Sequence, residues 1–119
     1  MRKPNIIQEK TYSFSLKVVR LCRFLVETRK EFVLSKQLCR SGTSIGANVE
    51  EAINAQTKKD FIYKMSISLK EANETKYWIR LIIDSGCSEN GNFNGLLSDI
   101  DEIIALLVSI IKTSRLSFA

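Results

Sequence analysis

The chain of 119 residues is long enough for one domain with a single core and too short for two ordinary domains. Apolar residues make up 45% of the chain and charged residues 26%, a balance that excludes wholesale disorder. The net charge of +5 permits binding to RNA or DNA, although a soluble protein that is only incidentally basic has the same balance.

The apolar residues recur at intervals of three and four, a spacing that is typical of helices and not of strands. Four helices are expected, at residues 8–28, 32–55, 58–85 and 94–115. Thr57 is expected to cap the third helix, because its hydroxyl can accept a hydrogen bond from an N–H group of the first turn. Gly86 is placed to end the same helix.

Short connections join these expected helices, so consecutive helices should be antiparallel neighbours. The expected fold is therefore an all-α, up-down-up-down four-helix bundle that forms one domain over residues 1–119. On the first helix, Phe14 and Val18 mark the side that faces the core. Val19, Cys22 and Val26 are expected to widen this apolar stripe.

The second expected helix contains Gly42 and Gly46, although each glycine costs a helix interior about 1 kcal/mol relative to alanine. On a helical wheel both glycines lie in the packing stripe, together with Leu38 and Ile45. Two small residues at this spacing let another helix backbone approach closely. We therefore interpret the two glycines as the site of a close helix crossing.

The third and fourth expected helices carry more apolar surface than one core requires. Opposite its core face the third helix has a second stripe, made of Ile67, Trp78, Leu81 and Ile82. The apolar residues of the fourth helix cover an arc of roughly 160°, wider than the ~100° that a single core needs. Such an excess marks an interface, so we expect a homo-oligomer. The alternative is that a tilted helix buries both stripes inside one chain.

The sequence lacks the usual metal and catalytic patterns. Since it contains no histidine, it cannot supply the Glu-x-x-His motifs of di-iron bundles, and we expect no metal and no other cofactor. No phosphate-binding loop or dinucleotide fingerprint occurs. Ser41, Thr43 and Ser44 have no histidine to activate them, although a lysine base is not excluded. We therefore expect a protein that is not an enzyme.

Charged residues of the second and third helices are placed to meet. Arg40 lies on one edge of the second helix, and Glu71 and Glu74 lie on the outer stripe of the third. A guanidinium can offer a carboxylate two parallel hydrogen bonds. We expect Arg40 to pair with Glu71 or Glu74, within one chain or between chains; the alternative is that all three are solvated.

Basic residues on the first helix are the candidate nucleic-acid contacts. They are Lys10, Lys17, Arg20 and Arg23. Repeated around an oligomer, they would form a ring of positive potential that suits phosphate groups. No element that could read a base sequence is evident.

The cysteines and the chain start bear on the compartment. Cys22, Cys39 and Cys87 have no C-x-x-C spacing, which argues against a disulfide framework and suits a reducing compartment. The first residues lack the apolar stretch of a signal peptide, and the longest apolar run, 103–111, is too short to cross a bilayer. We expect a cytoplasmic protein that does not bind membranes.

The stretch QLCRSGTSIGANVEEA, followed by KKDFIYKMSISLKEANETKYWIRLI, resembles the bacterial four-helix bundle proteins encoded within intervening sequences of 23S rRNA genes. The residues that carry the resemblance or the packing around it are Gln37, Arg40, Ser41, Gly42, Ser44, Ile45, Gly46, Asn48, Glu51, Glu71, Glu74 and Trp78. The resemblance covers residues 9–110 and implies an antiparallel bundle that assembles into a homopentamer. These residues would then serve the fold and the assembly.

The resemblance extends to the accessory variability proteins of diversity-generating retroelements. Those are basic pentameric barrels that bind a reverse transcriptase and nucleic acid, so the resemblance implies partners of these classes. The leading hypothesis is thus a non-enzymatic oligomer that binds RNA, DNA or a nucleic-acid-processing protein such as a reverse transcriptase. The alternative is a structural adaptor that binds proteins and no nucleic acid.

Overall fold

Four helices follow one another along the chain in the computed structural model, which describes residues 4–89 and 91–117. They are α1 (Pro4–Glu27), α2 (Val33–Ile53), α3 (Lys58–Asp84) and α4 (Phe93–Leu116). No strand occurs among the described residues, so the predicted all-α fold is confirmed. None of these four helices combines the length and the apolar character needed to cross a membrane.

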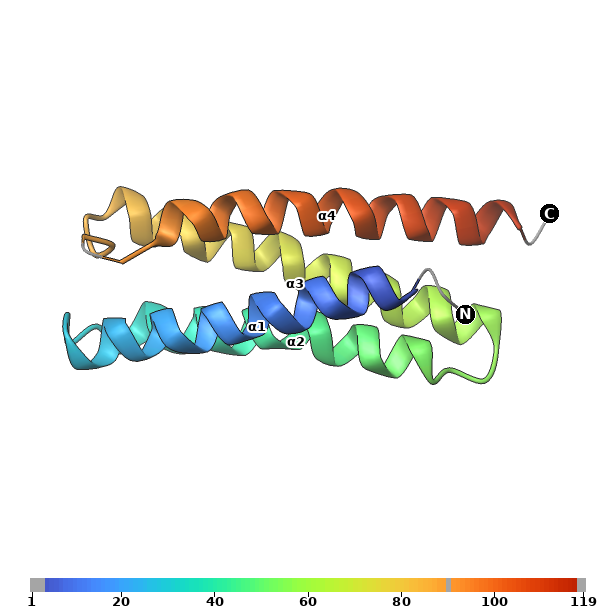
Figure 1. Cartoon of the computed structure of the whole chain (residues 1–119), viewed down its shortest axis with the longest axis horizontal. Coiled ribbons are helices and arrows are strands. Elements are labelled where there is room, and N and C mark those ends of the chain that lie inside the picture. Colours follow the sequence, from blue (N-terminus) through green and yellow to red (C-terminus); the bar gives the residue numbers. More distant parts are fainter. Residues whose placement is uncertain (1–3, 90, 118–119) are drawn as a thin grey trace.

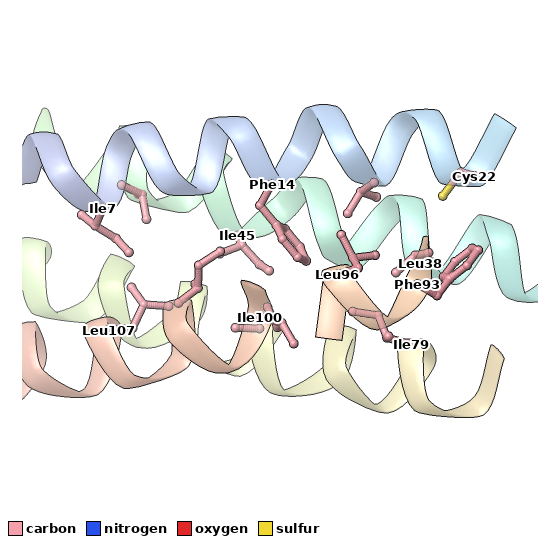
Figure 2. Close-up of a cluster of buried hydrophobic side chains, with 14 of the residues drawn as sticks. Ile7, Phe14, Cys22, Leu38, Ile45, Ile79, Phe93, Leu96, Ile100 and Leu107 are labelled. Atoms are coloured by element: carbon pink, nitrogen blue, oxygen red, sulfur yellow. The ribbon is translucent and has the colours of Figure 1, made fainter. Parts of the chain in front are cut away.

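The backbone of each helix lies close to the backbones of two others. α1 and α3 each lie beside α2 and α4, whereas the α1 and α3 backbones, and those of α2 and α4, face each other across the interior. The three connections lie alternately at the two ends of the elongated molecule (Figure 1). Side chains of all four helices therefore point into one shared interior, as Ile7, Phe14, Ile45, Ile79 and Leu107 do in Figure 2.

The helix ends agree closely with the sequence pattern, and their capping residues explain the differences. α1 begins at Pro4, earlier than expected, since proline suits the first turn of a helix, where an N–H group has no partner anyway. The turn after α1 also starts the next helix, because the Glu31 carboxylate accepts hydrogen bonds from the backbone N–H groups of Leu34 (3.1 Å) and Ser35 (2.9 Å). That cap was not predicted.

Two predicted signals at the ends of α3 are confirmed. The Thr57 hydroxyl accepts a hydrogen bond from the backbone N–H of Asp60 at 3.0 Å, which caps the helix. Gly86 has a φ of +85°, in the left-handed region that glycine adopts without strain, and it follows the last residues of the helix. Asn92 then caps α4 by accepting from the Gly95 N–H at 3.2 Å, so α4 begins one residue earlier than expected.

The predicted surplus of apolar surface on the fourth helix is mostly wrong. Ile103, Leu107 and Ile111 are buried within the single chain, and Ile104 and Ile110 pack against the core. The physical reason is that α4 lies between α1 and α3, so a wide apolar arc faces two neighbours at once. Val108 is left outside, with 46% of its surface exposed.

Two further predictions about apolar stripes also fail. Ile82 was expected on the outer stripe of the third helix, but its side chain faces the interior of the bundle and is fully buried. Val19, Cys22 and Val26 were expected to widen the core stripe of the first helix. Cys22 is buried as expected, but Val19 and Val26 are exposed (38% and 37%). These two valines lie beyond the arc of α1 that its neighbouring helices cover.

Candidate functional site

A cluster of charged and aromatic side chains joins the outer edges of α2 and α3. The Arg40 guanidinium of α2 contacts two carboxylates of α3: its Nη1 lies 3.4 Å from Glu71 Oε1, and its Nη2 pairs with Glu74 Oε2. The indole N–H of Trp78 donates to the same Glu74 oxygen at 3.1 Å. The prediction that Arg40 meets Glu71 or Glu74 is confirmed, and both pairs form within one chain.

The contacts in this cluster favour the charged forms of its members. The Trp78 hydrogen bond, and after it the Arg40 hydrogen bond and charge, hold the pKa of Glu74 below its usual range. The hydrogen bond to Glu74 in turn raises the pKa of Arg40. The charge of Lys70, one turn before Glu74 on α3, also lowers the pKa of Glu74, so the two carboxylates face two cations.

Buried hydroxyl groups connect α2 and α3 beneath the charged cluster. The hydroxyls of Ser41 and Thr75 are hydrogen-bonded at 2.9 Å, and Thr75 Oγ1 lies 2.7 Å from the carbonyl oxygen of Glu71. The Ser68 hydroxyl donates to the carbonyl oxygen of Ile45 at 2.8 Å. All three hydroxyl-bearing residues are buried, so these bonds satisfy polar groups that would otherwise be costly in the core.

The other polar residues that carried the family resemblance follow the exposed edge of α2. Ser44 donates to the carbonyl oxygen of Arg40 at 2.7 Å, and the Asn48 amide donates to that of Ser44 at 2.8 Å. Glu51 forms an ion pair with Lys64 of α3 at 2.6 Å, while Gln37 is half-buried on the same helix. Ser44 and Asn48 thus bond to the backbone of their own helix, and Glu51 bonds to the neighbouring helix.

The two glycines of α2 lie against α1. A Cβ atom at Gly42 would stand 2.9 Å from both methyl groups of Val18, too close for a normal contact. A Cβ atom at Gly46 would stand 3.4 Å from the backbone oxygen of Thr11. The close approach expected from the glycine spacing is therefore present, and the approaching helix is α1.

The basic residues predicted to contact nucleic acid divide into two pairs. Lys10 and Lys17 are ion-paired with carboxylates of α4, Lys10 with Glu102 at 3.0 Å and Lys17 with Asp99 at 2.7 Å. Arg20 and Arg23 are exposed. They form no ion pair within the part of the chain that the structure describes. Of the four basic residues predicted to contact nucleic acid, two are therefore engaged in ion pairs with α4.

A cavity of about 750 Å³ opens at the end of the bundle, between the turn that joins α2 to α3 and the last turns of α4. Ile53, Phe61 and Ile110 supply apolar walls, and α4 adds several hydroxyl groups. Lys58 also lines it and donates to the Ser117 hydroxyl at 2.6 Å. Among the residues that the structure describes, no carboxylate side chain lines this cavity.

Sequence reasoning missed most of the large apolar side chains that remain exposed. Tyr12 and Leu16 of α1 are 65% and 41% exposed, and Tyr63 and Tyr77 of α3 are 60% and 54% exposed. Helical spacing was the available signal: Tyr63 and Tyr77 continue the outer stripe of α3 that was predicted from Ile67 and Leu81, whereas no outer stripe was predicted on α1. Leu81, which was predicted to lie outside, is 37% exposed.

Comparison with known proteins identifies relatives. A family model described as 23S rRNA-intervening sequence protein matches residues 3–109. A crystal structure from Bacteroides thetaiotaomicron is described as a protein with unknown function from the S23 ribosomal protein family, and it is 49% identical in sequence. Its TM-score is 0.88, and the match covers 92% of this chain and 98% of that one. No curated protein matches the chain.

Proposed function

The chain belongs to the family of 23S rRNA-intervening sequence proteins, and from this premise we propose that it is a non-enzymatic, antiparallel bundle that assembles into a homopentamer and binds nucleic acid. We further propose that it acts in the cytoplasm. A nucleic-acid-processing protein such as a reverse transcriptase is the protein partner that the resemblance to retroelement accessory proteins suggests.

The proposal of self-assembly is supported mainly by the large apolar side chains that are exposed on α1 and α3. Tyr12, Tyr63 and Tyr77 each leave more than half of their surface in solvent when the chain is alone. Large aromatic side chains are enriched at protein interfaces, because they bury much area and lose little conformational entropy. Their removal from water would stabilise an assembly of several copies.

Net charge supports nucleic acid as the ligand of such an assembly. Five copies with +5 each would carry +25, and every copy presents Arg20 to solvent. Lysine and arginine side chains that neutralise phosphates release counterions, so the affinity falls steeply as salt rises. No catalytic family is indicated by the relatives, which agrees with a role in binding.

Electrophoretic mobility tests this proposal with a labelled RNA hairpin and a labelled DNA duplex across a range of NaCl concentrations. The expected result is a shift at low salt that weakens linearly in a plot of log K against log salt. Arg20→Ala is expected to reduce the slope, because it removes one phosphate contact per copy. Lys10→Ala is the matched control. Because Lys10 is already paired with Glu102, this variant is expected to keep the wild-type slope.

The adaptor hypothesis is favoured by a separate observation. Lys10 and Lys17, half of the predicted phosphate contacts, are committed to carboxylates of α4. If neither labelled probe shifts even at low salt, nucleic-acid binding is wrong and a protein-binding adaptor becomes the better explanation.

A further inference from the structure

The cavity of about 750 Å³ between the α2–α3 turn and the end of α4 plays no part in the proposed function. Both segments lie at the same end of the molecule (Figure 1). The volume falls within the range of about 300–1,000 Å³ that is typical of small-molecule sites. Ile53 of α2, Phe61 of α3 and Ile110 of α4 line it. These three side chains are only half-buried, so part of their apolar surface is left for an occupant.

The α4 wall of this cavity carries three hydroxyl groups, those of Ser109, Thr113 and Ser114. A serine or threonine inside a helix commonly bonds to a carbonyl oxygen of the preceding turn, as Thr43 and Ser44 of α2 do at 2.7 Å. The three α4 hydroxyls form no hydrogen bond within the part of the chain that the structure describes. They are therefore donors that a ligand in the cavity can use.

The lining of the cavity is also positively charged. Lys58 supplies an ammonium group, which donates to the Ser117 hydroxyl at 2.6 Å, and no carboxylate side chain among the described residues lines the cavity. The nearest carboxylates along the chain, Glu50, Glu51 and Asp60, line a separate hollow beside the same turn. An anionic head group is therefore favoured over a cationic one.

Groups around the end of α4 act in the same direction. Unpartnered carbonyl oxygens at the end of a helix would repel an anion. The carbonyl oxygens of Thr113 and Ser114 already accept hydrogen bonds from the N–H and the hydroxyl of Ser117, at 3.2 Å and 2.8 Å. Lys112 and Arg115 add two exposed cations near this end of α4. A negative head group is thus compatible with the helix end.

We propose that this cavity binds one straight-chain fatty acid in its anionic form. The alkyl chain would pack against the three apolar walls. The carboxylate, which only accepts hydrogen bonds, would bind the α4 hydroxyls near the ammonium group of Lys58. The site needs no second copy of the chain, so this proposal does not depend on the proposed assembly or on nucleic-acid binding.

Isothermal titration calorimetry of the purified full chain tests the proposal with decanoate and dodecanoate, each below its critical micelle concentration. One dodecanoate is expected to bind per chain. Dodecanoate is expected to bind about fifteenfold more tightly than decanoate, because each of its two extra methylene groups contributes about 0.8 kcal/mol when it is buried. Absence of dodecanoate binding to the wild type would overturn the proposal.

The head group is tested with dodecyltrimethylammonium, which has the same tail and a positive charge. It is expected to bind about tenfold or more weakly than dodecanoate, because the lining would repel it. Equal affinities would overturn the choice of an anion. The double variant Thr113→Ala/Ser114→Ala is expected to weaken dodecanoate binding about tenfold and to leave the ratio between dodecanoate and decanoate unchanged, because it removes donors but keeps the apolar walls.

A side chain that fills the cavity tests the location of the site. Ser109 is exposed and lines the cavity, so Ser109→Trp is expected to occupy it and to weaken dodecanoate binding about tenfold or more. Val108→Trp is the matched control, because Val108 is the neighbouring exposed residue and does not line the cavity. This control is expected to keep the wild-type affinity. Equal losses in the two tryptophan variants would show that dodecanoate binds elsewhere.

Two further measurements keep the outcomes distinct. Circular dichroism melts verify that each variant is folded. If Ser109→Trp unfolds, the double alanine variant serves as the test of the site, since alanine is a better helix former than serine or threonine. Native mass spectrometry compares Ser109→Trp with the wild type. A changed mass, together with no dodecanoate binding to the wild type, would assign the cavity to a contact between copies and overturn the proposal.

Discussion

Both methyl groups of Val18 in α1 lie 2.9 Å from the point where a Cβ atom at Gly42 in α2 would stand. Val18 is fully buried and β-branched, so its methyl groups have little freedom to move aside. A glycine at position 42 therefore lets the two helices approach each other. Its helix propensity is lower than that of alanine, and this loss is the energetic cost of the close contact.

Alanine at the two glycines of α2 is expected to have opposite effects. Gly42→Ala meets Val18, and overpacking of this kind costs about 1–3 kcal/mol, more than the ~1 kcal/mol that alanine contributes through helix propensity. Gly46→Ala meets the backbone of Thr11 only at 3.4 Å, so its stability is expected to be unchanged or up to about 1 kcal/mol higher. Urea unfolding followed by circular dichroism measures both.

A double variant provides the control for the clash. In the Gly42→Ala background, Val18→Ala removes the colliding methyl groups and is expected to cost less than it does in the wild type. This non-additivity is the signature of a direct contact. Equal stability of Gly42→Ala and Gly46→Ala would show that Val18 does not limit the approach of the two helices.

Removal of the Arg40 guanidinium is expected to destabilise the chain more than removal of an ordinary surface lysine. Arg40→Ala leaves Glu71, whose side chain is only 17% exposed, without its partner, and an unsatisfied half-buried group costs about 1–3 kcal/mol. Lys10→Ala breaks an exposed pair with Glu102 and is expected to cost about 0–1 kcal/mol. Thermal melts of both variants at low salt make the comparison. Equal melting temperatures would mean that the cluster contributes no more than a surface ion pair.

The same cluster is expected to make stability depend on pH on the acid side. Because hydrogen bonds from Trp78 and Arg40 lower the pKa of Glu74 in the folded chain, its contribution is complete above the ordinary value of 4.5. It is lost as the pH falls from there through the lowered pKa, since protonation removes the charged acceptor. Glu74→Gln is expected to flatten this part of a plot of melting temperature against pH.

Glu102→Gln is the control for the pH experiment, because Glu102 also forms an ion pair but is 56% exposed. At acid pH, the melting temperature of this variant is expected to change with pH as that of the wild type does. An identical acid limb in the wild type and in Glu74→Gln would show that Glu74 does not carry the pH dependence.

The sequence predicted the helices well because their signals are local. Spacings of three and four, the Thr57 cap and the Gly86 stop all depend on residues within one or two turns. The position of each apolar face relative to the neighbouring helices is not a local property. Ile82 and Val19 were therefore assigned to the wrong sides, since a wheel shows the direction of a side chain but not which helix covers it.

The site was predictable only in part for the same reason. Arg40, Glu71 and Glu74 were paired correctly, because opposite charges on facing helix edges have few other partners. The second partner of Glu74, the indole of Trp78 one turn away, was not recognised, because Trp78 was treated only as apolar surface. The loss of Lys10 to an ion pair required knowing that α4 lies beside α1.

Cys22 is expected to be the slowest of the three thiols to react in the folded chain. Burial first, and after it the neighbouring Cys39 thiol, raise the pKa of Cys22 from 9.0 to about 12, and its thiol donates to the carbonyl oxygen of Ser35 at 3.3 Å. Since the thiolate is the reactive form, the raised pKa leaves less of Cys22 in the reactive form at pH 8 than of an unperturbed thiol. Cys39 and Cys87 are half-buried and are expected to react sooner.

Iodoacetamide labelling followed by peptide mass spectrometry measures the reaction rate of each cysteine, with labelling in urea as the fully reactive reference. Cys39→Ser tests whether burial is the larger cause: if it is, Cys22 stays protected from labelling in this variant. In the folded wild type, labelling of Cys22 as fast as Cys87 would contradict the burial of Cys22 in the core.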